Sequence, residues 1–116
     1  MSEAVSAFAH VVADFIGVPA AQLQDQSLVC GLLVAAAGAA GLPVIGTPIV
    51  KTRPRGGVAA ILLLDGCHIA AHTFPERSLL LLDVLAGDDH HPERALEVFA
   101  RRLTAREIRR DTRARG

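Results

Sequence analysis

The clearest candidates for chemistry in this sequence are a cysteine, the histidine that follows it, and a second histidine four residues further on. They are Cys67, His68 and His72. A nearby imidazole favours the thiolate form of a cysteine, so Cys67 is a candidate nucleophile. His72 is a candidate acid or base. The alternatives are a small buried hydrophobe at position 67 and a hydrogen-bonded structural histidine at position 72.

Metal binding by the two histidines depends on the element that carries them. On a helix, residues four apart could share one metal ion. On a strand, His68 and His72 lie ~13 Å apart, at about 3.3 Å per residue. The cluster Asp88-Asp89-His90-His91 also has ligand-type side chains, but it precedes a predicted helix start, where acidic residues are favoured anyway. The sequence therefore predicts no metal site.

The elements that must position these residues are short apolar strands. Residues 58–64, 68–73 and 79–85 are runs of strand length, and Asp65-Gly66 separates the first two. Asp83 interrupts the third run. A buried carboxylate without partners is costly, so Asp83 is predicted to form an ion pair or to take part in a site.

The remaining segments complete an α+β pattern. Residues 8–15 fit a strand or a helix, and Gly17-Val18-Pro19 ends that element. A helix follows, because apolar residues between Leu23 and Ala36 fall near helical spacing, with Asp25 or Ser27 as its cap and Gly38 or Gly41 as its end. Residues 44–50 suggest a strand, 51–57 a loop, and Pro92 begins a second helix. The arginine-rich tail is predicted to be a solvated helix end and an edge strand.

Length and composition limit the class of protein. The 116 residues suffice for one domain, 1–116, and the formal net charge of zero gives no general attraction to nucleic acid or membrane. The uncharged stretch from Ser27 to Val50 is rich in Gly and Ala, so a buried helix and strand explain it better than a membrane span. Two cysteines make no disulfide framework and indicate a reducing cytoplasm.

The predicted fold class is α+β: a two-layer sandwich with a mainly antiparallel sheet and two helices on one face. Two layers leave the other face of the sheet partly uncovered. An exposed apolar face favours association, so we expect a homodimer.

The central segment resembles the bacterial and archaeal S-adenosylmethionine decarboxylases. Their hallmark is Glu-Ser-His, then His-Thr-Trp-Pro-Glu, then an Asp a few residues on. Here His68, His72-Thr73, Pro75-Glu76 and Asp83 stand at the same spacing, with Phe74 in place of Trp. Weaker similarity extends to residues 10–15, to Asp25 and to the closing helix at Pro92-Glu93.

This resemblance implies a carboxy-lyase of polyamine biosynthesis that makes its cofactor from its own backbone. Autocatalytic cleavage between Gly66 and Cys67 leaves a pyruvoyl group at position 67. A pyruvoyl group is an electron sink for decarboxylation of S-adenosylmethionine or a related small amino-acid substrate. The resemblance also implies catalytic roles for Cys67, His68 and His72, and substrate binding by Phe74 and Glu76.

The chain departs from the family pattern at several positions. Gly66-Cys67 replaces the cleavage pair Glu-Ser, and Ala59 stands where a serine assists processing. Gly87 stands where a cysteine donates a proton, and Arg53 aligns with an aromatic ring that helps to hold adenine. A second hypothesis therefore stays open: an uncleaved relative without a cofactor, which binds a small molecule or uses Cys67 as a thiol nucleophile.

Overall fold

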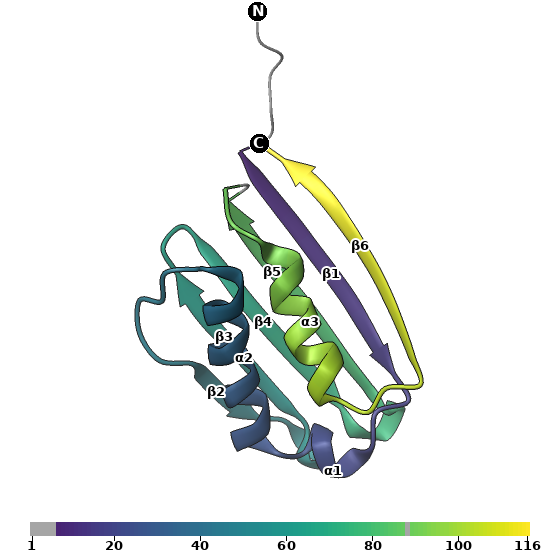
Figure 1. The fold of residues 1–116 in the computed structure, drawn as a ribbon. Helices are drawn as coiled ribbons and strands as arrows, with labels where there is room; N and C mark the ends of the chain where they lie inside the picture. Colours follow the sequence, from purple (N-terminus) through teal and green to yellow (C-terminus); the bar gives the residue numbers. More distant parts are fainter. Residues whose placement is uncertain (1–6, 88) are drawn as a thin grey trace, which may run out of the picture.

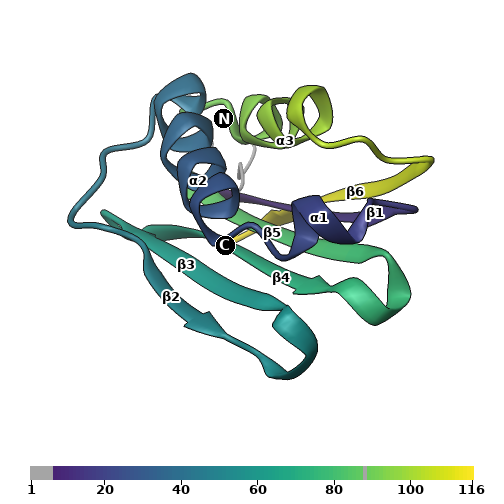
Figure 2. The same ribbon diagram turned by 90° about the horizontal axis from the view of Figure 1, so that it is seen from below.

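A six-stranded antiparallel sheet forms one layer of the molecule. The computed structural model describes residues 7–87 and 89–116, and in these residues the strand order is β2-β3-β4-β5-β1-β6. Helices α2 and α3 lie side by side over one face of the sheet (Figures 1 and 2). The predicted α+β sandwich is thereby confirmed. The strands are β1 (Phe8–Ile16), β2 (Ile49–Thr52), β3 (Val58–Leu64), β4 (Cys67–Phe74), β5 (Leu79–Gly87) and β6 (Glu107–Arg115).

Strand β1 resolves the ambiguity of the first segment. Val11, Ala13 and Phe15 are buried while the residues between them are more exposed, which is the alternation of a half-buried strand. β1 pairs along its whole length with β5 on one side and with β6 on the other. The arginine-rich tail is therefore the edge strand that the sequence suggested.

The first helical segment is divided in two. Asp25 has an extended backbone, which separates the single turn α1 (Ala20–Leu23) from α2 (Gln26–Ala40). The Asp25 carboxylate accepts a hydrogen bond from the Leu28 amide at 3.0 Å, as expected of an N-cap. Gly41 ends α2 with φ +72°, a conformation that favours glycine. The described residues thus hold three α-helices rather than the two predicted, the third being α3 (Pro92–Arg102).

Strand β2 lies further along the chain than predicted. Residues 44–50 were expected to form a strand, but Val44 makes only an isolated bridge to Leu64, and Pro48 lacks the amide proton that a ladder needs. The strand begins at Ile49 and continues through Lys51 and Thr52, which were predicted to lie in a loop. These two residues pair with Ala59 and Val58 of β3.

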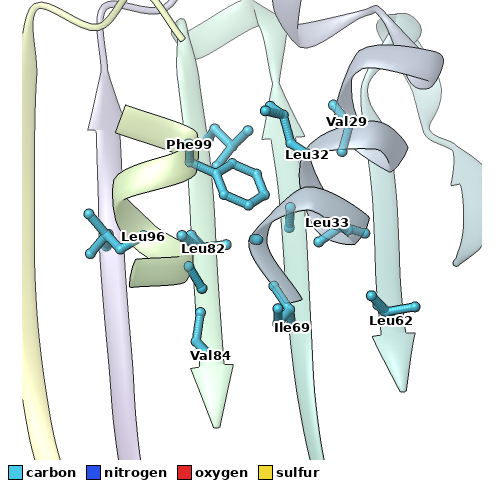
Figure 3. Packing of buried hydrophobic residues seen from close by; sticks show 14 of the residues in the cluster. Val29, Leu32, Leu33, Leu62, Ile69, Leu82, Val84, Leu96 and Phe99 are labelled. Atoms are coloured by element: carbon cyan, nitrogen blue, oxygen red, sulfur yellow. The ribbon is translucent and has the colours of Figure 1, made fainter. Parts of the chain in front are cut away.

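The core lies between the sheet and the two long helices. Phe15 of β1 and Phe99 of α3 approach within 6.3 Å between ring centroids, and aliphatic side chains fill most of the remaining volume. Figure 3 shows this packing, with α2 contributing Val29, Leu32 and Leu33, α3 contributing Leu96 and Phe99, and the sheet contributing Leu62, Ile69, Leu82 and Val84.

The opposite face of the sheet has no described helix over it, and we call it the open face (Figure 2). It is largely apolar over β2 to β5, and charged residues of β6, among them Asp111, Arg113 and Arg115, line its other edge beside β1. By strand alternation it carries Phe8, His10, Val12, Ile49, Lys51, Ala59, Ile61, Leu63, His68, Ala70, His72, Phe74, Leu81, Asp83 and Leu85.

Candidate active site

Strand β4 carries most of the predicted site residues and divides them between the two faces of the sheet. Ile69, Ala71 and Thr73 are buried under the helices. His68, His72 and Phe74 alternate with them and lie on the open face. By the same alternation, the Cys67 side chain lies on the helix-covered face, with Ile69, Ala71 and Thr73.

Cys67 opens β4 immediately after the turn Asp65-Gly66. It pairs with Leu64 across this hairpin, and Gly66 adopts φ +73°, which a glycine accommodates without strain. The Cys67 side chain is half-buried and packs against the edge of the core. It makes no hydrogen bond to any described histidine, so the structure does not bring the sulfur and the His68 imidazole together.

His68 contacts a carboxylate on the neighbouring strand instead. Its Nε2 lies 3.3 Å from Asp83 Oδ2, and the other Asp83 oxygen contacts Nε2 of His10 on β1. Nη1 of Arg115 on β6 lies 3.3 Å from Nδ1 of His10. Asp83 therefore has polar partners, as its position in an apolar strand led us to expect, and they are the imidazoles of two histidines. The Asp83 contact fixes the His68 imidazole on the open face.

The sequence reasoning missed His10 as a partner in this cluster. His10 and His68 each stand opposite Leu85, on either side of β5, and Asp83 is the next residue of β5 on the same face. Three strands that are distant in sequence must pair in this register before the contact exists. The similarity at residues 10–15 was the only signal that pointed to this histidine.

His72 lies at the edge of a shallow pocket on the open face. The side chain is exposed, and Ala59 of β3 stands directly opposite, with no hydroxyl to offer. The pocket has a volume of about 230 Å³ and a mainly aliphatic floor. Its lining residues are Ile49, Lys51, Ala59, Ala60, Ile61, Ala70 and His72.

A second pocket lies beside the turn that precedes Cys67. Its volume is about 260 Å³, and Phe8, Gly66, Leu85 and Arg115 contribute to its lining. Cys67 and His72 are five residues apart on one extended strand, or roughly 17 Å. The two candidate residues therefore do not meet within one chain.

Phe74 and Glu76 lie at the far end of β4. The Arg53 guanidinium carbon stands 4.2 Å from the centroid of the Phe74 ring, and Arg53 Nη1 donates a hydrogen bond of 2.9 Å to the Thr73 carbonyl oxygen. One face of Phe74 is thus covered by a cation. Glu76 is exposed on the 3-10 turn Pro75–Arg77.

Gly87 carries no side chain, and the group nearest to a Cβ built on it is an exposed carboxylate. A Cβ added there would lie 2.8 Å from Oδ1 of Asp89. The thiol that a cysteine would supply at this position is therefore absent, and the exposed Asp89 side chain would have to shift to admit one.

The sequence led us to expect neither a metal site nor a membrane-spanning helix. No group of three or more His, Cys, Asp or Glu side chains that could hold a metal ion occurs there, although Asp88 of the predicted loop cluster lies outside them. In residues 7–87 and 89–116, no helix is both long enough and apolar enough to cross a membrane.

Comparison with known proteins places this site in a wider context. The family model described as S-adenosylmethionine decarboxylase matches residues 9–116. The S-adenosylmethionine decarboxylase proenzyme of Aquifex aeolicus is 31% identical over 108 residues, covering 92% of this chain and 79% of the relative. The arginine decarboxylase proenzyme of Aeropyrum pernix is 31% identical over 100 residues, covering 84% and 75%.

A solved structure is similar along almost the whole chain. The crystal structure of the adenosylmethionine decarboxylase from Aquifex aeolicus matches with a TM-score of 0.88 and 29% sequence identity, over 97% of this chain and 93% of that one. The similarity therefore includes the sheet, both covering helices and the hairpin at Asp65-Gly66.

Proposed function

Because the chain belongs to the S-adenosylmethionine decarboxylase family, we propose that it is a decarboxylase that cleaves itself between Gly66 and Cys67. The observations that carry this proposal are the match of the family model to residues 9–116 and the similarity to relatives that are named proenzymes. The hairpin supports it, because an exposed Gly66 and a half-buried Cys67 meet at a tight turn.

The turn supplies the nucleophile and the attacked carbonyl of the cleavage, and the later steps also need a base for the Cys67 α-proton and a water molecule. The Cys67 thiolate attacks the carbonyl carbon of Gly66, the amide nitrogen leaves, and a thioester replaces the peptide bond. Loss of the Cys67 α-proton then expels the Gly66 thiocarboxylate and leaves dehydroalanine at position 67. Addition of water and loss of ammonia convert it to a pyruvoyl group. A Cβ built at Gly66 would meet nothing within 4 Å, so the surroundings of the attacked bond are open.

The pyruvoyl group would supply a carbonyl that accepts the electrons released when the substrate loses carbon dioxide. Position 67 would hold it, at the start of β4 beside the 260 Å³ pocket. We propose that His72 moves protons near the substrate, because it is exposed on the edge of the 230 Å³ pocket. His68, fixed by Asp83, would be a positioning residue on the same face.

Membership of the family does not by itself identify the amino acid that is decarboxylated. Relatives of this chain are named for S-adenosylmethionine and for arginine, at similar levels of identity. We therefore propose S-adenosylmethionine or a related amino acid as substrate, with Phe74 and Glu76 at the end of the site where β4 turns.

Self-cleavage is tested by denaturing mass spectrometry of the purified chain. We expect two fragments, 1–66 and 67–116, the second beginning with a pyruvoyl group in place of cysteine. Release of carbon dioxide from a panel of amino acids that includes S-adenosylmethionine measures the activity. An intact chain of 12.2 kDa that keeps a titratable Cys67 thiol would contradict the proposal.

We further propose that the open face joins two copies of the chain. Leu63 is 48% exposed there, and Phe8, Val12 and Ile49 on the same face are also exposed. An exposed apolar sheet face favours self-association in a closed symmetric pair. Such a pair could also bring Cys67 of one protomer near His72 of its partner, which one chain alone cannot do.

The dimer is tested with two matched substitutions. Leu63→Asp places a charge on the open face and is expected to weaken dimerisation by about a hundredfold or more, because an unpaired buried charge is costly. Val34→Asp is the control, since Val34 is similarly exposed, at 49%, but lies on α2. Sedimentation equilibrium at micromolar concentration measures both. A monomeric parent chain, or equal weakening by both substitutions, contradicts the assignment.

A further inference from the structure

The residue at the proposed cleavage point is a cysteine rather than the serine of the family pattern, and this determines which atom stays on Gly66. This inference rests on the proposed function, because it starts from cleavage between Gly66 and Cys67. The acyl shift joins the Gly66 carbonyl carbon to the Cys67 sulfur. When a base removes the Cys67 α-proton, the bond between the β-carbon and the sulfur breaks, and its electron pair leaves with the sulfur. The sulfur therefore stays on Gly66, where a serine would have left an oxygen.

The end of β3 keeps its contacts after such a cut, because its partners belong to the same fragment, 1–66. The Asp65 amide donates a hydrogen bond of 3.2 Å to the Pro43 carbonyl oxygen. Leu64 forms an isolated bridge with Val44. Neither contact uses a residue beyond the cleavage point. The new chain end is therefore held beside the start of β4.

Gly66 is open to small molecules. It is exposed at the turn, and a Cβ built on it would meet nothing within 4 Å. It also borders the pocket of about 260 Å³ that Phe8 and Leu85 help to line. A group formed on the Gly66 carbonyl carbon can therefore be reached from solution.

A cation borders the same pocket. Arg115 of β6 lines it together with Gly66, and Nη1 of Arg115 lies 3.3 Å from Nδ1 of His10. None of the ion pairs formed by residues 7–87 and 89–116 includes Arg115. An anion on Gly66 would be repelled by the neighbouring Asp65 carboxylate and attracted by this guanidinium. Arg115 is therefore the candidate counter-ion for a negative charge at the new chain end.

We propose that the cleaved chain keeps the Cys67 sulfur as a thiocarboxylate on Gly66, with Arg115 as its counter-ion, and that this group is a second reactive site. Like a thiolate, the anionic sulfur is a soft nucleophile. Its partners are small molecules with an electrophilic carbon. The sulfur forms a bond to that carbon, the leaving group departs with its electron pair, and Gly66 becomes a thioester.

Mass spectrometry of the Cys30→Ala chain tests the proposal, because cleavage of that chain leaves no cysteine in either fragment. Fragment 1–66 is expected to be about 16 Da heavier than it would be with a carboxylate, since sulfur replaces oxygen. Iodoacetamide is expected to alkylate fragment 1–66 and to leave fragment 67–116 unmodified. The chain with both Cys30→Ala and Cys67→Ser is the matched control. It is expected to end in a carboxylate and to resist alkylation.

The counter-ion is tested by comparing a negatively charged reagent, iodoacetate, with neutral iodoacetamide. In a Cys30→Ala background, Arg115→Met is expected to lower the ratio of the two alkylation rates by about threefold, because a nearby cation attracts the charged reagent. Arg101→Met, on α3 in the other layer, is the control and should leave the ratio unchanged. An unchanged ratio in the Arg115→Met chain would overturn the assignment of Arg115.

The outcomes separate this proposal from the proposed function. An intact chain would contradict both. A cleaved chain whose fragment 1–66 ends in a carboxylate would overturn the thiocarboxylate and leave self-cleavage standing. Alkylation of fragment 67–116 would do the same, since it would show that the sulfur had stayed on residue 67.

Discussion

A chain carrying Cys67→Ala is expected to stay at its full 12.2 kDa and to lose decarboxylase activity by at least about a thousandfold. Alanine removes the only side-chain nucleophile of the turn and keeps the backbone, so the Gly66 carbonyl meets no attacking atom. Because Cys67 is half-buried against the core edge, the smaller side chain is tolerated. Cys67→Ser is expected to be cleaved, since a hydroxyl supports the same acyl shift through an ester.

Cys30→Ala is the matched control for this experiment. Cys30 is the other free cysteine and is also partly exposed, but it lies on α2, and burial raises the pKa of its thiol. A raised pKa keeps more of the thiol protonated and so less nucleophilic at neutral pH. Mass spectrometry should show that the Cys30→Ala chain is cleaved between Gly66 and Cys67 to the same extent as the unsubstituted chain. Cleavage of Cys67→Ala at the same bond would show that another group starts the reaction.

The sequence alone could have predicted which side chains of β4 lie on each face of the sheet. Once residues 68–73 are assigned to a strand, His68 and His72 must share a face, and this was used to exclude a shared metal ion. The same alternation places Cys67 and His68 on opposite faces. The predicted activation of Cys67 by its neighbour therefore conflicted with the predicted strand, and the structure separates the two side chains.

The contacts of Asp83 show the limit of local reasoning. Its position in an apolar strand predicted a partner, and two histidines provide it. The identity of those partners depends on the strand order β4-β5-β1. This order brings Asp83 next to His10 and His68, which lie 73 and 15 positions away from it in the sequence. Sequence spacing holds no information on such a register unless a turn connects the strands.

The full extent of β2 was missed for a related reason. Lys51 and Arg53 lie in a polar, proline-containing and glycine-containing segment, which is typical of a loop. Pairing with β3 extends the strand through Lys51 and Thr52, and Arg53 follows its alignment. The position of an edge strand is set by its neighbour, so the row that includes Ala59 and His72 could be recognised only from the pairing.

The second large effect expected is on stability, at Thr73. Among the described residues it is the one buried polar side chain, with no exposed area. Its Oγ1 donates a hydrogen bond to the Leu23 carbonyl oxygen at 2.7 Å and accepts one from the Val58 amide at 2.7 Å. Thr73 thus ties β4, β3 and the end of α1 together, between His72 and Phe74.

Thr73→Val keeps the shape of the side chain and removes both hydrogen bonds. A buried amide and a buried carbonyl then lose a partner, at about 1–3 kcal/mol each, so the free energy of unfolding should fall by about 2–6 kcal/mol. Thr73→Ser keeps the hydroxyl and should recover most of that loss. Thr112→Val on the exposed edge strand β6 is the control, expected to change stability by about 0.5 kcal/mol at most.

Urea denaturation of the three variants measures these differences. If Thr73→Val is no less stable than Thr112→Val, the two hydrogen bonds add nothing that valine packing cannot replace, and another contact must hold the end of β4 in register. If Thr73→Ser is as unstable as Thr73→Val, loss of the methyl group costs as much as loss of the hydroxyl, and the hydrogen bonds alone do not account for the stability of this strand end. The expected order, with serine above valine at position 73, would show that a buried hydroxyl fixes the strand end that carries His72 and Phe74.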